Sequence, residues 1–341
     1  MNKNLNTLLY ATLLGVGLSL ISSAQAQTAE DFYKGKTINL VVGFTPGGGY
    51  DTYARLLSRH FSRHLPSNPN TTVLNMPGGG SALAVRHLDA TAVRDGTVIS
   101  AFNPGVISEA LMNPEKMNIK FNEVAWVGSI TRDFRVCYAW HTTPIKGWAD
   151  LVQGKAFVVG DNGIGTGARV NGSVLKNLFN FNIKQVTGYP GSAEMSLAIE
   201  RGELEGQCTS WSSINSDWIR DKKITPLVRF SPVRTPDIPE SVQFIGDLAE
   251  TQEQKDVIGM LIGPGELGRP YIMSKRVPID RLQLMRAGFD ATMKDPAFLA
   301  EAEKMRLPIN PVTGEEAEAI IERIFNSSPD MVEKTKEILN K

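Results

Sequence analysis

The sequence has no excess of charge of either sign and few residues that commonly bind metals. Its 341 residues include 36 Lys and Arg against 36 Asp and Glu, so the formal net charge is zero. A neutral chain has no overall field to attract nucleic acid or an anionic membrane, so we predict neither as a partner. His60 and His64 are four residues apart, but no nearby Glu or Cys completes a site, so no metal is predicted.

The sequence also lacks the short motifs of common nucleotide-binding and hydrolytic enzymes. No Gly-Lys-Ser/Thr follows a glycine-rich loop, and no Gly-x-Ser-x-Gly motif offers a nucleophile. Gly163, Gly165 and Ala168 fit a loosened dinucleotide-binding pattern. The acidic residue expected about 20 positions later is missing, because Ile183–Ser192 contains no carboxylate. We therefore predict no cofactor and no catalysis.

Long apolar runs are missing beyond the N-terminus. Lys3 precedes the apolar stretch Leu8–Ile21, and Ala24-Gln25-Ala26 then supplies small residues at the cleavage positions. This order is typical of an export signal, so residues 1–26 are predicted to be a signal peptide cleaved after Ala26. The alternative is a retained membrane anchor, but a membrane span needs about 20 apolar residues. We expect a soluble, exported product.

Cysteine is rare, because the chain contains only Cys137 and Cys208. Both lie in strand-like segments, and in an oxidising compartment two cysteines can form one disulfide. The alternative is a pair of buried thiols that pack as small hydrophobic side chains. The sequence favours neither, because it does not give the Cα separation that a bridge requires.

Glycine, by contrast, is concentrated in two loops that share one pattern. The first loop follows an apolar strand at 37–44 and reads Thr45-Pro46-Gly47-Gly48-Gly49-Tyr50-Asp51. The second loop follows a strand at 71–74 and reads Met76-Pro77-Gly78-Gly79-Gly80-Ser81. Each loop precedes a helix-like stretch. Glycine lets the backbone approach a ligand closely, and the first N–H groups of a helix suit an anion. The two loops predict a cleft that holds a carboxylate or phosphate with main-chain donors.

The rest of the chain alternates strands and helices joined by short loops, which indicates an α/β fold with parallel sheets. Asp51 is expected to cap the first long helix, whose apolar side chains recur at helical spacing from Tyr53 to Phe61. The cycle starts again at Arg135, so two sheets are predicted. Further strands are expected at 97–102, 124–130, 136–140, 155–160, 184–189, 204–208 and 225–230, and C-terminal helices at 279–293, 315–326 and 331–339.

Residues that follow these strands extend the predicted site, because open α/β sheets bind ligands at the carboxyl ends of their strands. Asn103 is expected to cap a helix that begins at Pro104, and Ser192 is expected to cap the helix that follows it. Gly165 and Thr166 belong to a third glycine-containing loop, at 161–167.

Aromatic and basic side chains complete the set of candidates. Tyr50, Trp211 and Arg169 would supply an aromatic wall and a guanidinium group suited to an organic acid. Ordinary core packing is the alternative for Trp211, and a surface salt bridge is the alternative for Arg169.

Five segments of the chain also follow one known family pattern, in order. The first glycine loop, with Phe44 before it and Ala54-Arg55 after it, is similar to an F-x-P-G-G-G-x-D-x-x-A-R opening. Asn75–Ser81 is similar to N-x-P-G-A-G-G. The later segments are Asp95-Gly96-Thr97, Tyr189–Ala193 and Lys294–Phe298. Together they resemble the substrate-binding proteins of tripartite tricarboxylate transporters, the Bug or TctC family, over nearly all of the mature chain.

The resemblance implies a periplasmic, two-domain binding protein of the type II kind. Two parallel-rich sheets would be joined by crossover strands, with a ligand cleft between them. The ligand would be an organic acid such as a dicarboxylate, a tricarboxylate or an aromatic carboxylate. It would be delivered to a membrane transporter made of one large and one small integral subunit, and a monomer is expected. A periplasmic sensor that signals its bound state to a partner is the alternative function, and an exported hydrolase is a third.

The resemblance and the loops together give the ligand-binding residues and the domains. The predicted ligand-binding residues are Phe44, Thr45, Pro46, Gly47, Gly48, Gly49, Tyr50, Asp51, Pro77, Gly78, Gly79, Gly80, Ser81, Asn103, Gly165, Thr166, Arg169, Tyr189, Gly191, Ser192 and Trp211. Residues 27–133 and 227–300 are assigned to the first domain and residues 134–226 to the second. Residues 301–341 are expected to form C-terminal helices that the sequence assigns to neither domain.

Overall fold

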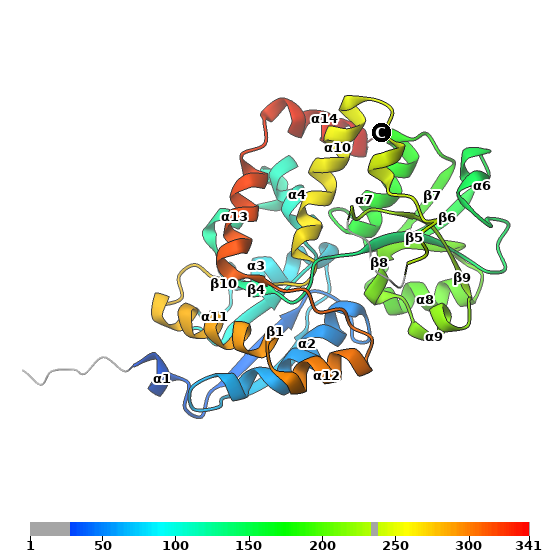
Figure 1. The fold of residues 1–341 in the computed structure, drawn as a ribbon. Helices are drawn as coiled ribbons and strands as arrows, with labels where there is room; N and C mark the ends of the chain where they lie inside the picture. Colours follow the sequence, from blue (N-terminus) through cyan, green and yellow to red (C-terminus); the bar gives the residue numbers. More distant parts are fainter. Residues whose placement is uncertain (1–27, 233–237, 341) are drawn as a thin grey trace, which may run out of the picture.

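The computed structural model describes residues 28–232 and 238–340, which form two sheets with helices packed against them (Figure 1). The predicted signal peptide, residues 1–26, lies outside the described residues. None of the described helices is long and apolar enough to cross a membrane. The two-sheet α/β architecture expected from the sequence is confirmed.

The first sheet contains six strands. They are β1 (Thr37–Val42), β2 (Asn70–Asn75), β3 (Val98–Ala101), β4 (Val124–Ser129), β10 (Pro270–Ser274) and β11 (Val312–Thr313). Their order across the sheet is β11-β4-β10-β3-β1-β2. Strand β1 runs parallel to β2 and β3, whereas β10 runs antiparallel to both β3 and β4.

The second sheet contains five strands. They are β5 (Arg135–Trp140), β6 (Phe157–Asp161), β7 (Ile183–Thr187), β8 (Gly206–Ser210) and β9 (Ile224–Arg229). Their order is β7-β6-β8-β5-β9. Strand β6 runs parallel to β7 and β8, whereas β5 runs antiparallel to β8 and β9.

Helices cover both faces of the first sheet because side chains alternate along its central strands. Leu40 and Val42 of β1 pack in one core with Phe289, whereas Val41 packs in the opposite core with Ile320. The described helices are α1 (Ala29–Phe32), α2 (Gly49–His60), α3 (Ala82–Ala90), α4 (Gly105–Met112), α5 (Pro114–Met117), α6 (Trp148–Val152), α7 (Gly167–Ser173), α8 (Ser192–Glu200), α9 (Ser216–Arg220), α10 (Gln252–Ile262), α11 (Ile279–Met293), α12 (Pro296–Lys304), α13 (Gly314–Phe325) and α14 (Pro329–Asn340).

The chain crosses between the two sheets more than once. It enters the second sheet between β4 and β5, and returns to the first between α10 and β10. Residues 227–232 and 238–262, which the sequence analysis groups with the first domain, lie with the second sheet: Phe230, Ile245 and Ile258 belong to its core. The C-terminal helices α13 and α14 pack against different halves of the molecule. Ile320 of α13 lies in a core of the first sheet, whereas Asn177 Nδ2, from the second half, donates to the Ile338 carbonyl of α14 at 2.7 Å.

Two features of the sheets differ from the sequence expectation. Each sheet is mixed rather than parallel, because β5 and β10 run against their neighbours. A strand buried on both faces gives the same apolar run in either direction, so its sequence carries no sign of this. Strand β10 was also not expected, although all five of its residues are buried, and nor were helices α10 and α12.

Candidate ligand-binding site

The first glycine loop begins α2 one turn earlier than the sequence suggests. Gly48 is the N-cap and the helix starts at Gly49, so Asp51 is not the cap. Its buried carboxylate instead accepts hydrogen bonds from the Gly47 N–H, Arg55 Nε and Asn75 Nδ2, each at 2.9 Å. Burial raises the pKa of Asp51, but these hydrogen bonds outweigh it and hold the pKa below its ordinary value. The carboxylate thus ties the loop to the end of β2.

The second glycine loop has a different conformation. Four consecutive residues have positive φ: Gly78 (152°), Gly79 (55°), Gly80 (63°) and Ser81 (82°). Helix α3 therefore starts only at Ala82. The buried Ser81 hydroxyl accepts a hydrogen bond from the Asn103 N–H at 2.8 Å. This hydrogen bond connects the second glycine loop to the loop that follows β3.

Loops of the two halves contact each other directly. Thr45 Oγ1 donates to Glu194 Oε2 at 3.0 Å. Opposite the second glycine loop, a Cβ on Gly80 would lie 2.5 Å from Thr166 Cγ2. A Cβ on Gly105 would likewise overlap the Gly165 carbonyl oxygen. Gly80 and Gly105 leave no space for a side chain at these two points, so the backbone of the first half lies close to the second half there.

A small central cavity of about 30 Å³ lies between the first glycine loop and residues of the second half. Gly48, Gly49 and Tyr50 place the N-terminus of α2 in its wall, and Ser192 places the N-terminus of α8 there. Both helix ends present N–H groups without intrahelical partners and with partial positive charge. The full lining is Phe44, Gly48, Gly49, Tyr50, Asn103, Arg135, Asn162, Ala168, Ser192, Thr209, Ser210 and Ser213.

Tyr50 lines the central cavity and packs between Phe44 and Arg269. Its ring stacks on Phe44, with the ring centroids 4.8 Å apart, and the Arg269 guanidinium carbon lies 4.4 Å from its centroid. The hydroxyl is buried and has no hydrogen-bond partner among the described residues. Burial raises the pKa of Tyr50, against the opposing effect of Arg269, so the group remains a donor at neutral pH.

Three charged residues beside the cavity form a buried charge cluster: Asp133, Arg135 and Arg269. Asp133 accepts from Arg135 Nε and from the Ser210 hydroxyl, and lies 4.0 Å from Arg269 Nη1. Their side chains are 2%, 11% and 1% exposed, respectively. Two guanidinium charges against one carboxylate leave one positive charge in excess. A buried excess charge is unfavourable without a counter-ion, so the arrangement favours an anion in the cavity.

No protein-family model and no curated protein matches this sequence. Solved structures do match it, beginning with the periplasmic binding protein BugD at 18% identity. The match covers 90% of this chain and 98% of that one, with a TM-score of 0.73. The chain has the fold of the periplasmic binding protein BugD.

Two other matches of this fold were solved with acids present. MatC of Rhodopseudomonas palustris, with bound malate, is 16% identical over 89% of this chain and 99% of that one, with a TM-score of 0.69. A second R. palustris protein, with adipate, is 17% identical over 88% and 97%, with a TM-score of 0.70. The fold that the resemblance implies is thus confirmed.

In this BugD-like fold, six of the predicted ligand-binding residues line the central cavity. They are Phe44, Gly48, Gly49, Tyr50, Asn103 and Ser192. The N-cap of α4 is Pro104 rather than the predicted Asn103, whose Oδ1 accepts a hydrogen bond from the Gly105 N–H at 2.8 Å. The cap of α8 is Gly191 rather than the predicted Ser192, which is the first helical residue.

Two larger spaces flank the central cavity. A hinge cavity of about 490 Å³ lies between residues 132–135, the start of α4, α7 and residues 259–266. An entrance groove of about 1140 Å³ lies between α8 with residues 211–219 and α12 with residues 305–309. Gly47 and Trp211 line this groove.

Most of the remaining predicted residues hold the loops together and line none of these three spaces. Six of them lie in the loops where the two halves meet or make hydrogen bonds that hold these loops: Thr45, Asp51, Gly80, Ser81, Gly165 and Gly191. Thr166 caps α7, and Tyr189 packs against a core of the second sheet. Pro46, Pro77, Gly78 and Gly79 are exposed.

Arg169 points away from the central cavity. Its Nη1 lies 3.5 Å from Asp161 Oδ2 and donates to Thr187 Oγ1 at 3.3 Å. The side chain is 35% exposed. The structure therefore has the salt bridge that the sequence analysis gave as the alternative for Arg169.

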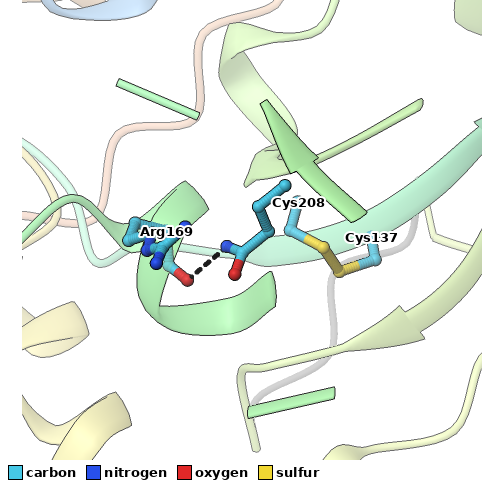
Figure 2. Close-up of a disulfide and its surroundings, with 4 residues drawn as sticks. Cys137, Arg169 and Cys208 are labelled. Carbon is cyan, nitrogen blue, oxygen red and sulfur yellow. Dashed lines mark hydrogen bonds between the residues drawn. A yellow bond between two sulfur atoms is a disulfide. The ribbon is translucent and has the colours of Figure 1, made fainter. Parts of the chain in front are cut away.

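Cys137 and Cys208 form a disulfide between β5 and β8, where they are directly paired (Figure 2). Of the two alternatives left open by the sequence, the bridge is the one present. Both residues are fully buried. Figure 2 also shows Arg169, whose carbonyl oxygen accepts a hydrogen bond from Gln185 Nε2 at 2.9 Å.

The sequence analysis missed half of the lining of the central cavity. These residues are Arg135, Asn162, Ala168, Thr209, Ser210 and Ser213. Arg135 is the most important of them, because it carries charge. A Cβ on Gly167 would overlap its guanidinium group, so glycine is needed where Arg135 lies. The only sequence signal was its place at the start of a strand after a crossover, which does not identify a ligand contact.

Proposed function

We propose that this protein is a periplasmic solute-binding protein that captures a small organic acid between its two halves. It would deliver the acid to a transporter of the tripartite tricarboxylate type, with one large and one small membrane subunit. The fold of BugD supports this proposal, as do the export signal and the family motifs in the sequence. We further propose that it acts as a monomer and performs no chemistry on its ligand.

The observation that carries the proposal is the excess positive charge beside the central cavity. Arg135 lines the cavity, and Asp133 compensates only one of the two guanidinium groups in the buried charge cluster. The N-termini of α2 and α8 add partial positive charge from two further directions. A carboxylate placed there would neutralise the cluster and accept from main-chain N–H groups and the Tyr50 hydroxyl.

Closure of the two halves would couple binding to delivery. Donors from both halves line the central cavity, so an acid held there would favour the closed arrangement over an open one. The population shift is set by the difference in affinity between the two arrangements. A transporter that recognises the closed arrangement would then select loaded protein.

A thermal-shift screen of the mature protein tests this function. The panel would contain short dicarboxylates, citrate, aromatic acids and amino acids, each with its amide as a control. We expect an upward shift of the midpoint with at least one acid and none with its amide, because a ligand that binds only folded protein stabilises it. Isothermal titration would then give the affinity. An absence of any shift, repeated after unfolding and refolding to remove a co-purified ligand, would contradict the proposal.

A further inference from the structure

The central cavity can hold only part of an acid. Its volume of about 30 Å³ is far below the roughly 300–1,000 Å³ of pockets that hold a whole small molecule, so it has room for a carboxylate group but not for a complete organic acid. The remainder of the ligand must therefore lie in a neighbouring space. The hinge cavity and the entrance groove are the two neighbours.

The hinge cavity has the size and lining of a small-molecule site. Its volume of about 490 Å³ lies within the range of roughly 300–1,000 Å³ typical of ligand pockets. Apolar side chains of the second half line it, including Phe134, Val170, Phe230 and Leu261, and Pro104 and Ser108 line it from the first half. Asn171, which is 4% exposed, also lines it, and its Nδ2 has no hydrogen-bond partner among the described residues. A buried donor without a partner is unfavourable unless a ligand or water supplies an acceptor.

Arg135 joins the hinge cavity to the central cavity, because it lines both. Its Nε is occupied by Asp133, whereas no hydrogen bond of its Nη1 or Nη2 is found among the described residues. Nη1 lies against the backbone of Gly167, so Nη2 is the terminal nitrogen left for a carboxylate at the boundary of the two spaces. An acid held there would have its body on the hinge side.

The entrance groove is a poorer fit for the body of a ligand. Leu197 on its second-half wall is 50% exposed, and Leu299 on its first-half wall is 39% exposed. Ligand pockets usually bury most of the ligand surface, which a groove this open to solvent does not do. Both spaces have buried walls and exposed rims, but the volume of the hinge cavity lies within the range typical of ligand pockets, whereas that of the groove, about 1140 Å³, lies above it.

We propose that the ligand is a monocarboxylate with a bulky apolar body, whose carboxylate occupies the central cavity while its body fills the hinge cavity. This inference rests on the proposed function and narrows it. Because the hinge cavity is lined by the crossover residues 132–135 and by residues 263–265 before β10, its occupant would contact the segments that must bend when the halves separate.

Isothermal titration of the mature protein with three acids tests the inference. The acids are 4-phenylbutanoate, butanoate and adipate. Two variants at lining residues reduce the hinge cavity: Ser108→Leu on α4 and Gly259→Leu on α10. A Cβ on Gly259 meets nothing within 4 Å, so this variant adds volume without a clash. Ala300→Leu, at an exposed position of α12 outside all three spaces, is the control.

We expect wild type to bind 4-phenylbutanoate at least about tenfold more tightly than butanoate, because burying an aromatic ring removes much apolar surface from water. Ser108→Leu and Gly259→Leu should each abolish this preference and leave the response to butanoate unchanged. Ala300→Leu should behave as wild type. If one of the filling variants fails to fold, judged by circular dichroism, the other decides the result.

Four outcomes would overturn the inference. The filling variants could keep the wild-type preference, or weaken all acids equally, which would indicate an effect on closure rather than on the ligand body. Wild type could instead prefer adipate, in which case the inference fails while the proposed function stands. If wild type binds none of the three acids and the wider panel also gives no shift, the proposed function fails as well.

Discussion

The two glycine loops are similar in sequence but differ in conformation and in what they contact. The first loop, 45–51, passes directly into α2 and places Gly48, Gly49 and Tyr50 in the wall of the central cavity. In the second loop, 76–81, four residues have positive φ before α3 begins. This loop lines none of the three spaces found in the described part of the chain. Its backbone contacts Thr166 of the other half instead.

The difference shows that a glycine run has two uses that sequence alone does not separate. At Gly48 the φ of −83° suits any residue, so the absent side chain leaves room for a ligand. At Gly80 the φ of 63° and the nearby Thr166 both require glycine for the backbone itself. The first loop thus lines the central cavity and also contacts the second half through Thr45, whereas the second loop only contacts the second half.

Placing the same substitution in each loop gives the largest expected contrast. Gly48→Asp would put a carboxylate beside the N-terminus of α2, where its Cβ lies 2.8 Å from Ser192 Oγ. Competition with the ligand and like-charge repulsion should weaken acid binding by at least about a hundredfold. The thermal midpoint without ligand should change little. Titration with the acid identified in the panel measures the effect.

Gly79→Asp in the second loop is the matched control. Gly79 is exposed, and its φ of 55° is a conformation that Asp tolerates better than most residues. Affinity should stay within about twofold of wild type, as for most surface changes. Equal losses in the two variants would contradict the separation of roles between the loops.

The next contrast is between two arginines. Arg135→Gln removes the guanidinium that lines the central cavity and leaves the buried charge cluster neutral, with Asp133 facing Arg269. Affinity should fall about ten- to a hundredfold, the range for losing a hydrogen bond to a charged group. Arg169→Gln removes the predicted guanidinium that instead pairs with Asp161, and should leave affinity within about twofold. A larger loss in Arg169→Gln would reverse our assignment.

A smaller effect is expected from the second loop when its backbone is altered. Gly80→Ala combines a left-handed φ with a close approach to Thr166, so it should lower stability by about 1–3 kcal/mol. It should also weaken acid binding about fivefold by holding the halves apart, a cost of about 1 kcal/mol. Thermal unfolding and titration measure the two effects separately.

Gly35→Ala is the control that distinguishes the effect of backbone strain from the effect of the contact with Thr166. Gly35 has a similar φ of 70° but no atom within 4 Å of its Cβ position. It should lose stability without losing affinity. If both variants bind the acid as wild type does, the second loop has no part in closure.

The sequence was informative wherever a local pattern determines the structure. Apolar runs predict most strands, and the segment Phe44–Tyr50 indicates the central cavity because a loop at the carboxyl end of a parallel strand is where open α/β sheets bind ligands. The order of family motifs indicated the fold, which the BugD match confirms. These features depend on residues that are neighbours in the chain.

What the sequence did not reveal depends on residues that are distant in the chain. Arg135 reaches the cavity because a crossover carries β5 past α7, where Gly167 leaves room for its guanidinium. Arg169 looked equally suitable, but Asp161, eight residues earlier, holds it away. The antiparallel course of β5 and β10 likewise follows from chain topology, and no local pattern records it.

The last prediction concerns how each loop is fixed. Asp51 anchors the first loop through a carboxylate, whereas Ser81 and three glycines fix the second without any ionisable group. Asp51→Asn should therefore lower stability at neutral pH by about 1 kcal/mol, because Arg55 is exposed and its pairing is screened by solvent. Its effect on affinity should be the smallest of the series.

The pH dependence of that loss distinguishes the two ways of fixing a loop. The folded pKa of Asp51 lies below its ordinary value of 3.8, so its stabilisation is fully present above 3.8. It is lost as the pH falls below 3.8 and through the lowered folded pKa. The difference in unfolding free energy between wild type and Asp51→Asn should therefore shrink from neutral pH to about pH 3. A constant difference over that range would mean that the carboxylate charge does not anchor the first loop, and that both loops are held by backbone conformation.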